Sequence, residues 1–277
     1  MEDNRKYWFV MISGCVLLKK EGETYSVPLQ EEPPAPIQAW TYVQELPELN
    51  GHECRAFSVS TPPEAMRRGE LESVNLRSSF NYLPLEFYNM AGKGAELLYW
   101  DSNTKYCGVC GAPMKTATVI SKKCTNCGKE VWPQVSPAII VRIRRNDTPD
   151  NPANEKILLV HARNFRSDYF GLVAGFVETG ETLEECVERE VREETGLKIK
   201  NIRYFGSQPW PYPCGVMIGF TADYESGEVK IQKEELSKSG WFGRNDMPAI
   251  PGKMSIARKL IDDWMKGPSK NSPFTNL

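Results

Sequence analysis

Short apolar runs separated by polar turns dominate the first third of the chain. Strands are predicted, between Pro-rich or Asn-Gly turns, at Trp8–Leu18, Thr41–Leu46 and Arg55–Ser60. From Leu83 to Trp100 the apolar residues instead recur at helical spacing, interrupted by Gly92 and Gly94. This region is therefore predicted to hold strands followed by an interrupted helix, and it carries no recognisable chemical motif.

The second half of the chain is also rich in strand patterns. Strands are predicted at Ala138–Ile143, Lys156–Val160, Arg203–Gly206, Val216–Tyr224 and Val229–Ile231. Two amphipathic helices are predicted, one from Thr182 to Gly196 and one over Lys253–Met265. Two long helices in a strand-rich chain indicate a mixed sheet packed between helices. We find no internal repeat in the sequence.

The first of these helices has clear end signals. Thr182 is followed three residues later by Glu185, which is the spacing of a capping box, and Gly196 suits the C-terminal cap. At 100° per residue, the apolar positions form one inward stripe, made of Leu183, Val187 and Val191.

Carboxylates crowd this helix, and their positions divide them into two groups. Glu185 and Glu188 point to the solvent side, whereas Glu190 and Glu194 fall near the apolar stripe with Glu193 beside them. Partly desolvated carboxylates about 4 Å apart would repel by roughly 4 kcal/mol at an effective dielectric of 20. A divalent cation removes this cost, and oxygen ligands suit magnesium or manganese, which also bridge to phosphates. We therefore expect Glu190, Glu193 and Glu194 to face inward around a cation.

Four of the eight cysteines form two C-x-x-C pairs, Cys107/Cys110 and Cys124/Cys127, thirteen residues apart. Two thiolates on each tight turn supply the four ligands of a closed, structural zinc site. A redox pair would be expected singly near a βαβ unit, which is absent from the predicted elements. The segment that holds these cysteines, a zinc ribbon if the metal is bound, also carries five lysines and one glutamate. Nucleic-acid binding is one interpretation of these charges, and a solvated surface is the simpler one.

Composition narrows the classes of function. The net charge of −2 over 277 residues gives no sign of non-specific binding to nucleic acid or anionic membranes. No run approaches eighteen apolar residues, so no transmembrane helix is predicted. The start of the chain weakly resembles a lipoprotein signal at Cys15, but its apolar run is short and Glu2 and Asp3 replace the expected positive charges. We therefore expect a cytoplasmic protein with free thiols outside the zinc site.

The carboxylate helix completes a longer motif. Gly175, five residues, Glu181, seven residues and then Arg189 to Leu197 fit every fixed position of G-x5-E-x7-R-E-U-x-E-E-x-G-U, where U is bulky and apolar. In this the chain resembles the Nudix hydrolases. The resemblance implies an α/β/α sandwich, and metal-assisted attack of water on phosphorus in a nucleoside diphosphate linked to another group.

The resemblance also assigns roles to residues. Glu190 and Glu194 would be metal ligands together with the Ala174 carbonyl. Glu193 would be a ligand or help to activate water, and Arg189 would hold the glutamates by ion pairing. The candidate catalytic residues are Glu181, Arg189, Glu190, Glu193 and Glu194. With only two histidines, neither in a motif, carboxylates and metal must carry the acid–base work.

A Pro-rich segment follows the motif. Ser207 to Pro213 reads SQPWPYP, in which three prolines restrict the backbone and two aromatic rings suit a flat base. The segment is similar to the SQPWPFPxS string of the NADH pyrophosphatase branch of the Nudix family, which also has a zinc ribbon and an N-terminal domain. Two positions depart from that string: Tyr212 replaces Phe, and Gly215 replaces the final Ser. The loss of that hydroxyl puts in doubt a polar contact there.

This branch implies further site residues. Glu235 matches an extra metal-binding glutamate, with Glu234 beside it leaving the register open by one. The candidate substrate-binding residues are Arg77, Trp132, Gln208, Pro209, Trp210, Pro211, Tyr212, Pro213, Cys214, Gly215 and Ala257. The branch forms homodimers, so a homodimer is implied as well.

Together these features predict an α/β (α+β) fold: a Nudix α/β/α sandwich with a mixed sheet at 134–277, preceded by a zinc ribbon at 103–133 and a smaller N-terminal α/β domain at 1–102. The expected activity is magnesium- or manganese-dependent hydrolysis of NAD(H) to AMP and nicotinamide mononucleotide, and the same chemistry would remove NAD caps from RNA. The alternatives are another dinucleotide, such as ADP-ribose or a dinucleoside polyphosphate, and a nucleic-acid-binding protein with a degenerate Nudix fold.

Overall fold

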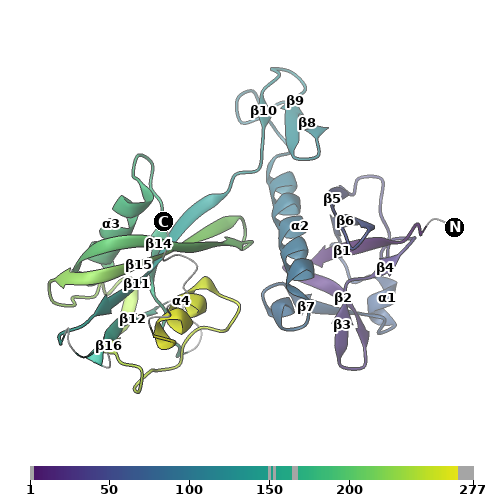
Figure 1. Ribbon diagram of the computed structural model, residues 1–277. Helices are drawn as coiled ribbons and strands as arrows, with labels where there is room; N and C mark the ends of the chain where they lie inside the picture. Colours follow the sequence, from purple (N-terminus) through teal and green to yellow (C-terminus); the bar gives the residue numbers. More distant parts are fainter. Residues whose placement is uncertain (1–2, 149–150, 152–153, 164–167, 268–277) are drawn as a thin grey trace. The chain divides into compact units, whose positions relative to one another are not determined.

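The computed structural model describes residues 3–148, 151, 154–163 and 168–267 (Figure 1). The chain divides into two compact units. The N-terminal unit comprises residues 1–135 together with 209–214, and the C-terminal unit comprises residues 136–208 and 215–277. Among the described residues, no helix is long and apolar enough to cross a membrane. The predicted three-part division of the chain stays a prediction, which we take up below.

The N-terminal unit is built on a mixed sheet. The described residues form seven strands: β1 (Lys6–Ile12), β2 (Cys15–Glu21), β3 (Thr24–Ser26), β4 (Leu29–Gln30), β5 (Gln44–Leu49), β6 (His52–Ser58) and β7 (Leu71–Asn75). β1 pairs in parallel with β6 and antiparallel with β2. The single strand expected over Trp8–Leu18 is therefore wrong. Ser13 and Gly14, both at positive φ, turn the chain between β1 and β2, as in two-residue hairpins.

One long helix packs on this sheet. After the short helices α1 (Glu64–Arg67) and η1 (Ser78–Asn81), helix α2 (Leu85–Asn103) is continuous, so the expected interruption is wrong (Figure 1). Its two glycines allow close approach instead of breaking the helix. A Cβ on Gly92 would lie 2.9 Å from the Pro211 side chain, and one on Gly94 would lie 3.0 Å from Ala56.

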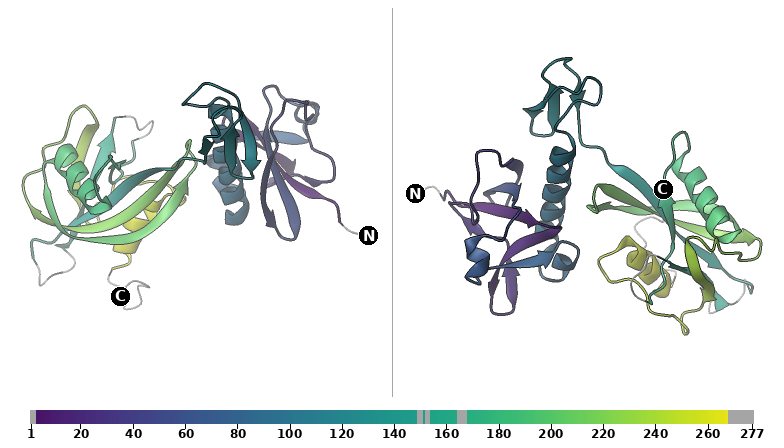
Figure 2. Two further views of the ribbon diagram at one scale, coloured as in Figure 1. Left: turned by 90° about the horizontal axis from the view of Figure 1, so that it is seen from above. Right: turned by 180° about the vertical axis from the view of Figure 1, so that it is seen from behind.

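The zinc ribbon forms a small antiparallel sheet at the end of α2, with strands β8 (Met114–Thr118), β9 (Ser121–Cys124) and β10 (Glu130–Val131) (Figure 2). Lys122 in β9 is buried, and its Nζ lies 2.6 Å from Asp101 Oδ1. The same Nζ donates to the carbonyls of Asp101 and Thr104, at 3.0 and 3.1 Å. Lys122 thus binds two carbonyls at the C-terminus of α2 and fixes the ribbon to this unit.

The C-terminal unit contains a second mixed sheet. Its described strands are β11 (Ser136–Arg145), β12 (Lys156–Ala162), β13 (Val173–Phe176), β14 (Lys198–Trp210), β15 (Gly215–Ser226) and β16 (Leu236–Phe242). β11 is central: it pairs in parallel with β15 and antiparallel with β12 and β13. The strands predicted at Ala138–Ile143, Lys156–Val160, Arg203–Gly206 and Val216–Tyr224 lie within these and are confirmed.

Two helices cover opposite faces of this sheet, α3 (Leu183–Thr195) and α4 (Ile256–Met265) (Figure 1). Ile139 and Val141 of β11 pack in the same core as Val187 of α3, whereas Ile140 packs with Leu260 of α4. Neighbouring residues of β11 reach opposite cores because side chains alternate along a strand. This arrangement confirms the predicted α/β/α sandwich with a mixed sheet.

Two predicted elements differ from the structure. Val229–Ile231 is not a strand; Lys230 N donates to the Thr195 carbonyl at 2.8 Å, so the segment lies against the C-terminal end of α3. Its apolar residues read as a strand because they pack against the core from an irregular segment. Helix α4 begins at Ile256 because the Ser255 side chain accepts from Arg258 N and caps it.

Candidate active site and metal centre

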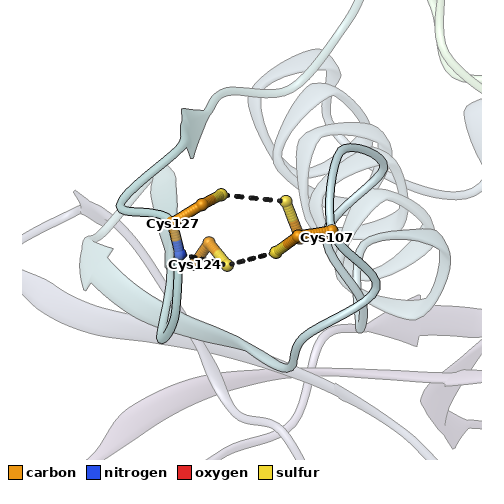
Figure 3. Close-up of side chains that lie close together, drawn as sticks. Cys107, Cys124 and Cys127 are labelled. Carbon is orange, nitrogen blue, oxygen red and sulfur yellow. Dashed lines mark hydrogen bonds between the residues drawn. The ribbon is translucent and has the colours of Figure 1, made fainter.

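The four ribbon cysteines lie close together. Figure 3 labels three of them, Cys107, Cys124 and Cys127. Their Sγ atoms all lie within 4.8 Å of one another, with Cys107 3.6 Å from Cys127 and Cys110 3.5 Å from Cys124. Four thiolates about 2.3 Å from a tetrahedral zinc ion would stand about 3.8 Å apart. The donor set and spacing thus fit structural zinc.

Backbone amides prepare these thiols to act as ligands. Val109 N donates to Cys107 Sγ, and Asn126 N donates to Cys124 Sγ, both at 3.4 Å. These hydrogen bonds hold the pKa of the Cys107 and Cys124 thiols below its usual range. Since the thiolate is the form that binds metal, these two hydrogen bonds favour the charge state that a zinc site needs at Cys107 and Cys124. The neighbouring thiols instead raise the pKa of Cys127, and a bound cation would remove this effect.

Helix α3 is fixed at both ends as the sequence predicts. The Thr182 side chain accepts from Glu185 N at 3.2 Å, and Glu185 Oε2 accepts from Thr182 N at 2.7 Å, so the capping box is confirmed. Gly196 ends the helix at a φ of 72°, which confirms the glycine cap. These caps set the register of the carboxylates between them.

Arg189 contacts three of the predicted site glutamates. Its guanidinium binds Glu181 through two hydrogen bonds, at 2.7 and 2.9 Å, and also donates to the Phe176 carbonyl at 3.0 Å. It contacts Glu190 at 2.9 Å and Glu193 at 3.1 Å. The Arg189 contact, with a backbone hydrogen bond, lowers the pKa of Glu181 to about 2. The Arg189 side chain therefore links Glu181, in the loop before α3, to Glu190 and Glu193 within α3.

Glu194 is buried, with 5% of its surface exposed. Burial raises the pKa of its carboxyl to about 8, and the charges of Glu190, Glu235 and Glu193 add to the effect. Burial likewise raises the pKa of Glu190, although Arg189 opposes that shift. Carboxylates that are buried together and repel one another form a site that a divalent cation would stabilise.

The position of Glu193 differs from the prediction that its side chain faces inward with those of Glu190 and Glu194. Its side chain is 54% exposed, so the prediction that it faces inward is wrong. It lies one residue, or 100°, from the buried Glu194, which turns it to the edge of the buried face. An exposed carboxylate in contact with Arg189 remains available to accept a proton from water.

A cavity of about 400 Å³ collects the other predicted ligands. Ala174, Glu194 and Glu235 line it, together with Val160, Ala162, Arg163, Leu172, Glu234 and Leu236. Glu235 is the neighbour whose charge acts on both Glu190 and Glu194, which favours Glu235 over Glu234 as the extra ligand. Glu190 does not line this cavity, and among the described residues only the four cysteines form a group with ligand atoms within 4.8 Å.

Gly175 explains why the motif begins with glycine. It follows Ala174 in β13, and a Cβ built on it would overlap the carboxyl group of Glu190. The glycine therefore leaves the space that this carboxylate occupies. The oxygen donors around this point, together with the raised pKa of two of the carboxyls, fit magnesium or manganese.

The Pro-rich segment builds an aromatic cluster within the N-terminal unit. The rings of Trp210 and Tyr212 meet edge to face at 5.2 Å, and the Arg77 guanidinium lies 4.8 and 4.7 Å from their centroids. The Tyr212 hydroxyl, the addition relative to Phe, hydrogen-bonds Tyr88 at 2.7 Å. The structure thus brings the predicted Arg77 to the two predicted rings.

The remaining substrate-binding candidates lie in different surroundings. Gln208 accepts from Ile256 N at 2.6 Å and donates to the Met254 carbonyl at 2.9 Å, so it holds the start of α4. Ala257 is 7% exposed and packs in the core beneath α4, whereas Trp132 is 51% exposed. Of the other candidates, Pro209 lies near the end of β14 and Gly215 begins β15. The turn between these strands contains Pro211, Pro213 and Cys214. All of these substrate contacts stay predictions.

Comparison with known proteins places this geometry in a family. A NUDIX domain model matches residues 137–264, and a model of the NADH pyrophosphatase-like rudimentary NUDIX domain matches residues 5–100. An Escherichia coli protein (strain SMS-3-5 / SECEC) named NAD-capped RNA hydrolase NudC is 42% identical over 182 residues, which cover 65% of this chain and 68% of that protein.

The chain belongs to the Nudix hydrolase family.

A second curated relative agrees with this membership. A Citrobacter koseri protein, also named NAD-capped RNA hydrolase NudC, is 43% identical over 177 residues, covering 64% of this chain and 66% of that protein. The aligned segments thus span about two thirds of the length of these curated relatives. A solved NUDIX hydrolase from Nitrosomonas europaea matches with a TM-score of 0.48 and 20% identity, over 58% of this chain and 90% of that one.

The two family matches, at residues 5–100 and 137–264, also indicate a structural repeat that is not visible in the sequence. In the part of the chain that the structure describes, each sheet contains a parallel pair beside antiparallel ones, β1 with β6 in the first and β11 with β15 in the second. The N-terminal domain has the rudimentary Nudix fold without the glutamate motif. Because the repetition lies in strand arrangement and not in residue identity, inspection of the sequence could not find it.

Two residues that contact predicted site residues within their own units were missed. Arg163 lines the cavity, donates from its side chain to the Lys233 carbonyl, and donates from its backbone N to the Glu235 carbonyl at 2.8 Å. It thereby positions the loop that carries Glu235. Tyr88 is the second, as the partner of Tyr212. Neither lies in a motif; only the position of Arg163, three residues beyond the predicted strand Lys156–Val160, could have drawn attention to it.

Proposed function

We propose that this Nudix hydrolase cleaves the diphosphate bridge of NAD(H), giving AMP and nicotinamide mononucleotide, and removes NAD caps from RNA. The observation that carries the proposal is the 42–43% identity to proteins named NAD-capped RNA hydrolase, in a chain that keeps the whole glutamate motif. The match of residues 5–100 to an NADH pyrophosphatase-like domain supports the same substrate class.

The proposed metal ligands are the Ala174 carbonyl, Glu190, Glu194 and Glu235, holding magnesium or manganese. The repulsion among the three carboxyl groups and the raised pKa of Glu194 support this set. When bound, the metal would neutralise the diphosphate and make water a better nucleophile. The proposed zinc ligands, Cys107, Cys110, Cys124 and Cys127, leave no open position, so that ion would stabilise the ribbon.

The chain's own residues would divide the remaining work. Glu193, exposed and held by Arg189, would take a proton from the attacking water while the water oxygen forms a bond to phosphorus. The bond between phosphorus and the bridging oxygen breaks, and the electron pair leaves with the second phosphate. Arg189 would keep Glu190 and Glu193 in place through Glu181. Trp210 and Tyr212, with Arg77, would hold a flat base, and Trp132 and Ala257 would add contacts.

Three wider features belong to the proposal. A homodimer follows from the resemblance to the NADH pyrophosphatase branch. A reducing compartment such as the cytoplasm suits a chain in which none of the eight cysteines, all among the described residues, forms a disulfide. The division into an N-terminal domain (1–102), a zinc ribbon (103–133) and a Nudix domain (134–277) is supported by the two family matches, at 5–100 and 137–264.

The substrate is tested by competition. Equal concentrations of NADH, ADP-ribose and a diadenosine polyphosphate are offered with magnesium, and the rate at which each disappears is followed by chromatography. NADH should be consumed with the highest kcat/KM. Faster cleavage of ADP-ribose or of the polyphosphate, with NADH left intact, would assign the enzyme to another dinucleotide.

A further inference from the structure

The zinc ribbon, residues 103–133, has two faces that differ in exposure. Lys122 in β9 is buried against the end of α2, as described above, so its face of the ribbon sheet is covered. Lys123 is its neighbour in the strand and is exposed. Because side chains alternate along a strand, Lys123 and its cross-strand partners project from the opposite, outward face.

This outward face places like charges side by side. Lys115 of β8 lies directly opposite Lys123 of β9 in the antiparallel register. Like charges directly opposite one another destabilise a sheet. The carboxylate on the other flank of Lys123, that of Glu130, is engaged by the Ser121 hydroxyl at 2.6 Å. Nothing in the folding of the ribbon therefore requires two lysines here.

The five lysines of the ribbon differ in whether they form an ion pair with a carboxylate. Lys105 and Lys122 both pair with Asp101. Across the described part of the chain, no carboxylate forms an ion pair with Lys115, Lys123 or the exposed Lys129. Zinc with four thiolates contributes a charge of about −2, and five lysines against one glutamate still leave the ribbon positive.

The same ribbon exposes an aromatic ring. Tyr106, next to the first zinc-binding turn, is 70% exposed, although a tyrosine of a folded domain is commonly half-buried. Positive charge that follows a phosphate backbone, combined with aromatic surface on which bases stack, is the combination that binds single-stranded nucleic acid. The charge and the ring thus complement one class of partner, a single-stranded polyanion with bases.

We infer that the outward face of the zinc ribbon, through Lys115, Lys123 and Lys129, binds the phosphates of the RNA that follows an NAD cap. The inference rests on the proposed function, because only a capped RNA carries such a phosphate chain beyond the dinucleotide. Free NAD(H) gains nothing from these lysines. The ribbon therefore raises kcat/KM for capped RNA over the free dinucleotide, in addition to its structural role.

The test compares two substrates in the full-length, zinc-loaded protein. The variant carries Lys115→Gln, Lys123→Gln and Lys129→Gln, and kcat/KM is measured on NADH and on a single-stranded NAD-capped RNA across a range of salt. Loss of three phosphate contacts should flatten the log–log salt slope by about 2 and lower kcat/KM on capped RNA by roughly 10-fold at moderate salt. Activity on NADH should be unchanged.

Two further variants control for charge and folding. Lys198→Gln, Lys200→Gln and Lys259→Gln remove the same charge from exposed positions of the C-terminal unit and should leave the salt slope unchanged. Lys→Arg at the three ribbon positions keeps the charge and should retain the preference for capped RNA. Zinc content and Tm establish that the ribbon is intact in each variant.

The outcomes separate the inference from the function it rests on. If wild type cleaves neither NADH nor capped RNA, the proposed function itself fails. If wild type cleaves both and the ribbon variant keeps the wild-type salt slope on capped RNA, the ribbon inference alone is overturned. An equal loss in the control variant, or a wild type that cleaves NADH but not capped RNA, also overturns it.

Discussion

Replacing Gly175 by alanine should remove activity while leaving the fold intact. The new Cβ would overlap the carboxyl group of Glu190, and ordinary carbon contacts need about 3.5 Å, so this carboxylate must move by more than about 1 Å. Because it is the far end of a flexible side chain, it can move without unfolding the protein. That movement would take it from its 2.9 Å contact with Arg189 and from the position in which we propose that it binds the metal.

The size of the effect follows from this displacement. A catalytic group misplaced by about 1 Å costs on the order of 100-fold in rate, which corresponds to about 2.7 kcal/mol. Folding stability should change by no more than about 1 kcal/mol, since Gly175 lies in a strand without positive φ and alanine is favoured over glycine there.

The assay is kcat/KM on NADH with magnesium, together with Tm. Gly206→Ala is the matched control, because Gly206 also lies in a strand of the C-terminal unit and a Cβ there would meet nothing within 4 Å. It should keep wild-type activity. A Gly175→Ala enzyme with wild-type kcat/KM, or one whose loss is explained by a collapse in Tm, would refute the reasoning.

Three other predictions concern the carboxylate site and the zinc ribbon. Burial raises the pKa of Glu194 from an ordinary 4.5 to about 8, so this group costs the metal-free protein no stability below about pH 4.5, and stability falls as pH rises from there to about 8. Glu194→Gln should flatten this dependence in denaturant titrations, and a variant as pH-sensitive as wild type would argue against it. Arg189→Lys cannot form the two-bond contact with Glu181 and should lower kcat roughly 100-fold with little change in KM; a kcat within a factor of two of wild type would contradict the positioning role. Removing zinc with a chelator, or Cys124→Ser, should lower the Tm of the N-terminal unit, and an unchanged melting curve with zinc absent by elemental analysis would contradict a structural role.

Hydrophobic periodicity predicted the burial of a side chain correctly where its position within a single helix decides that burial. Helical spacing from Thr182 to Gly196 placed Glu194 at the buried stripe, and the structure buries it. The same spacing failed for Glu193, because a residue at the edge of a stripe turns inward or outward according to what packs beside it. Apolar residues at Val229–Ile231 suggested a strand for a related reason: burial, and not pairing, accounts for them.

Contacts between segments distant in the chain could not be predicted. Nothing local indicates that Lys122 binds Asp101, that Arg77 lies against Trp210, or that Tyr88 meets Tyr212. Each depends on how the sheet and α2 pack, which the alternation of apolar and polar residues does not specify. The glycines of α2 illustrate the same limit, since they read as helix breaks but allow close packing against Pro211 and Ala56.

The central claim is that carboxylates gathered around a divalent cation direct water to phosphorus in NAD(H). The most direct measurement is mass analysis of the products formed from NADH and magnesium in ¹⁸O-labelled water. The account predicts AMP and reduced nicotinamide mononucleotide, with one labelled oxygen in the phosphate that water attacks and none in the other. Intact NADH, or release of nicotinamide with ADP-ribose, would contradict it.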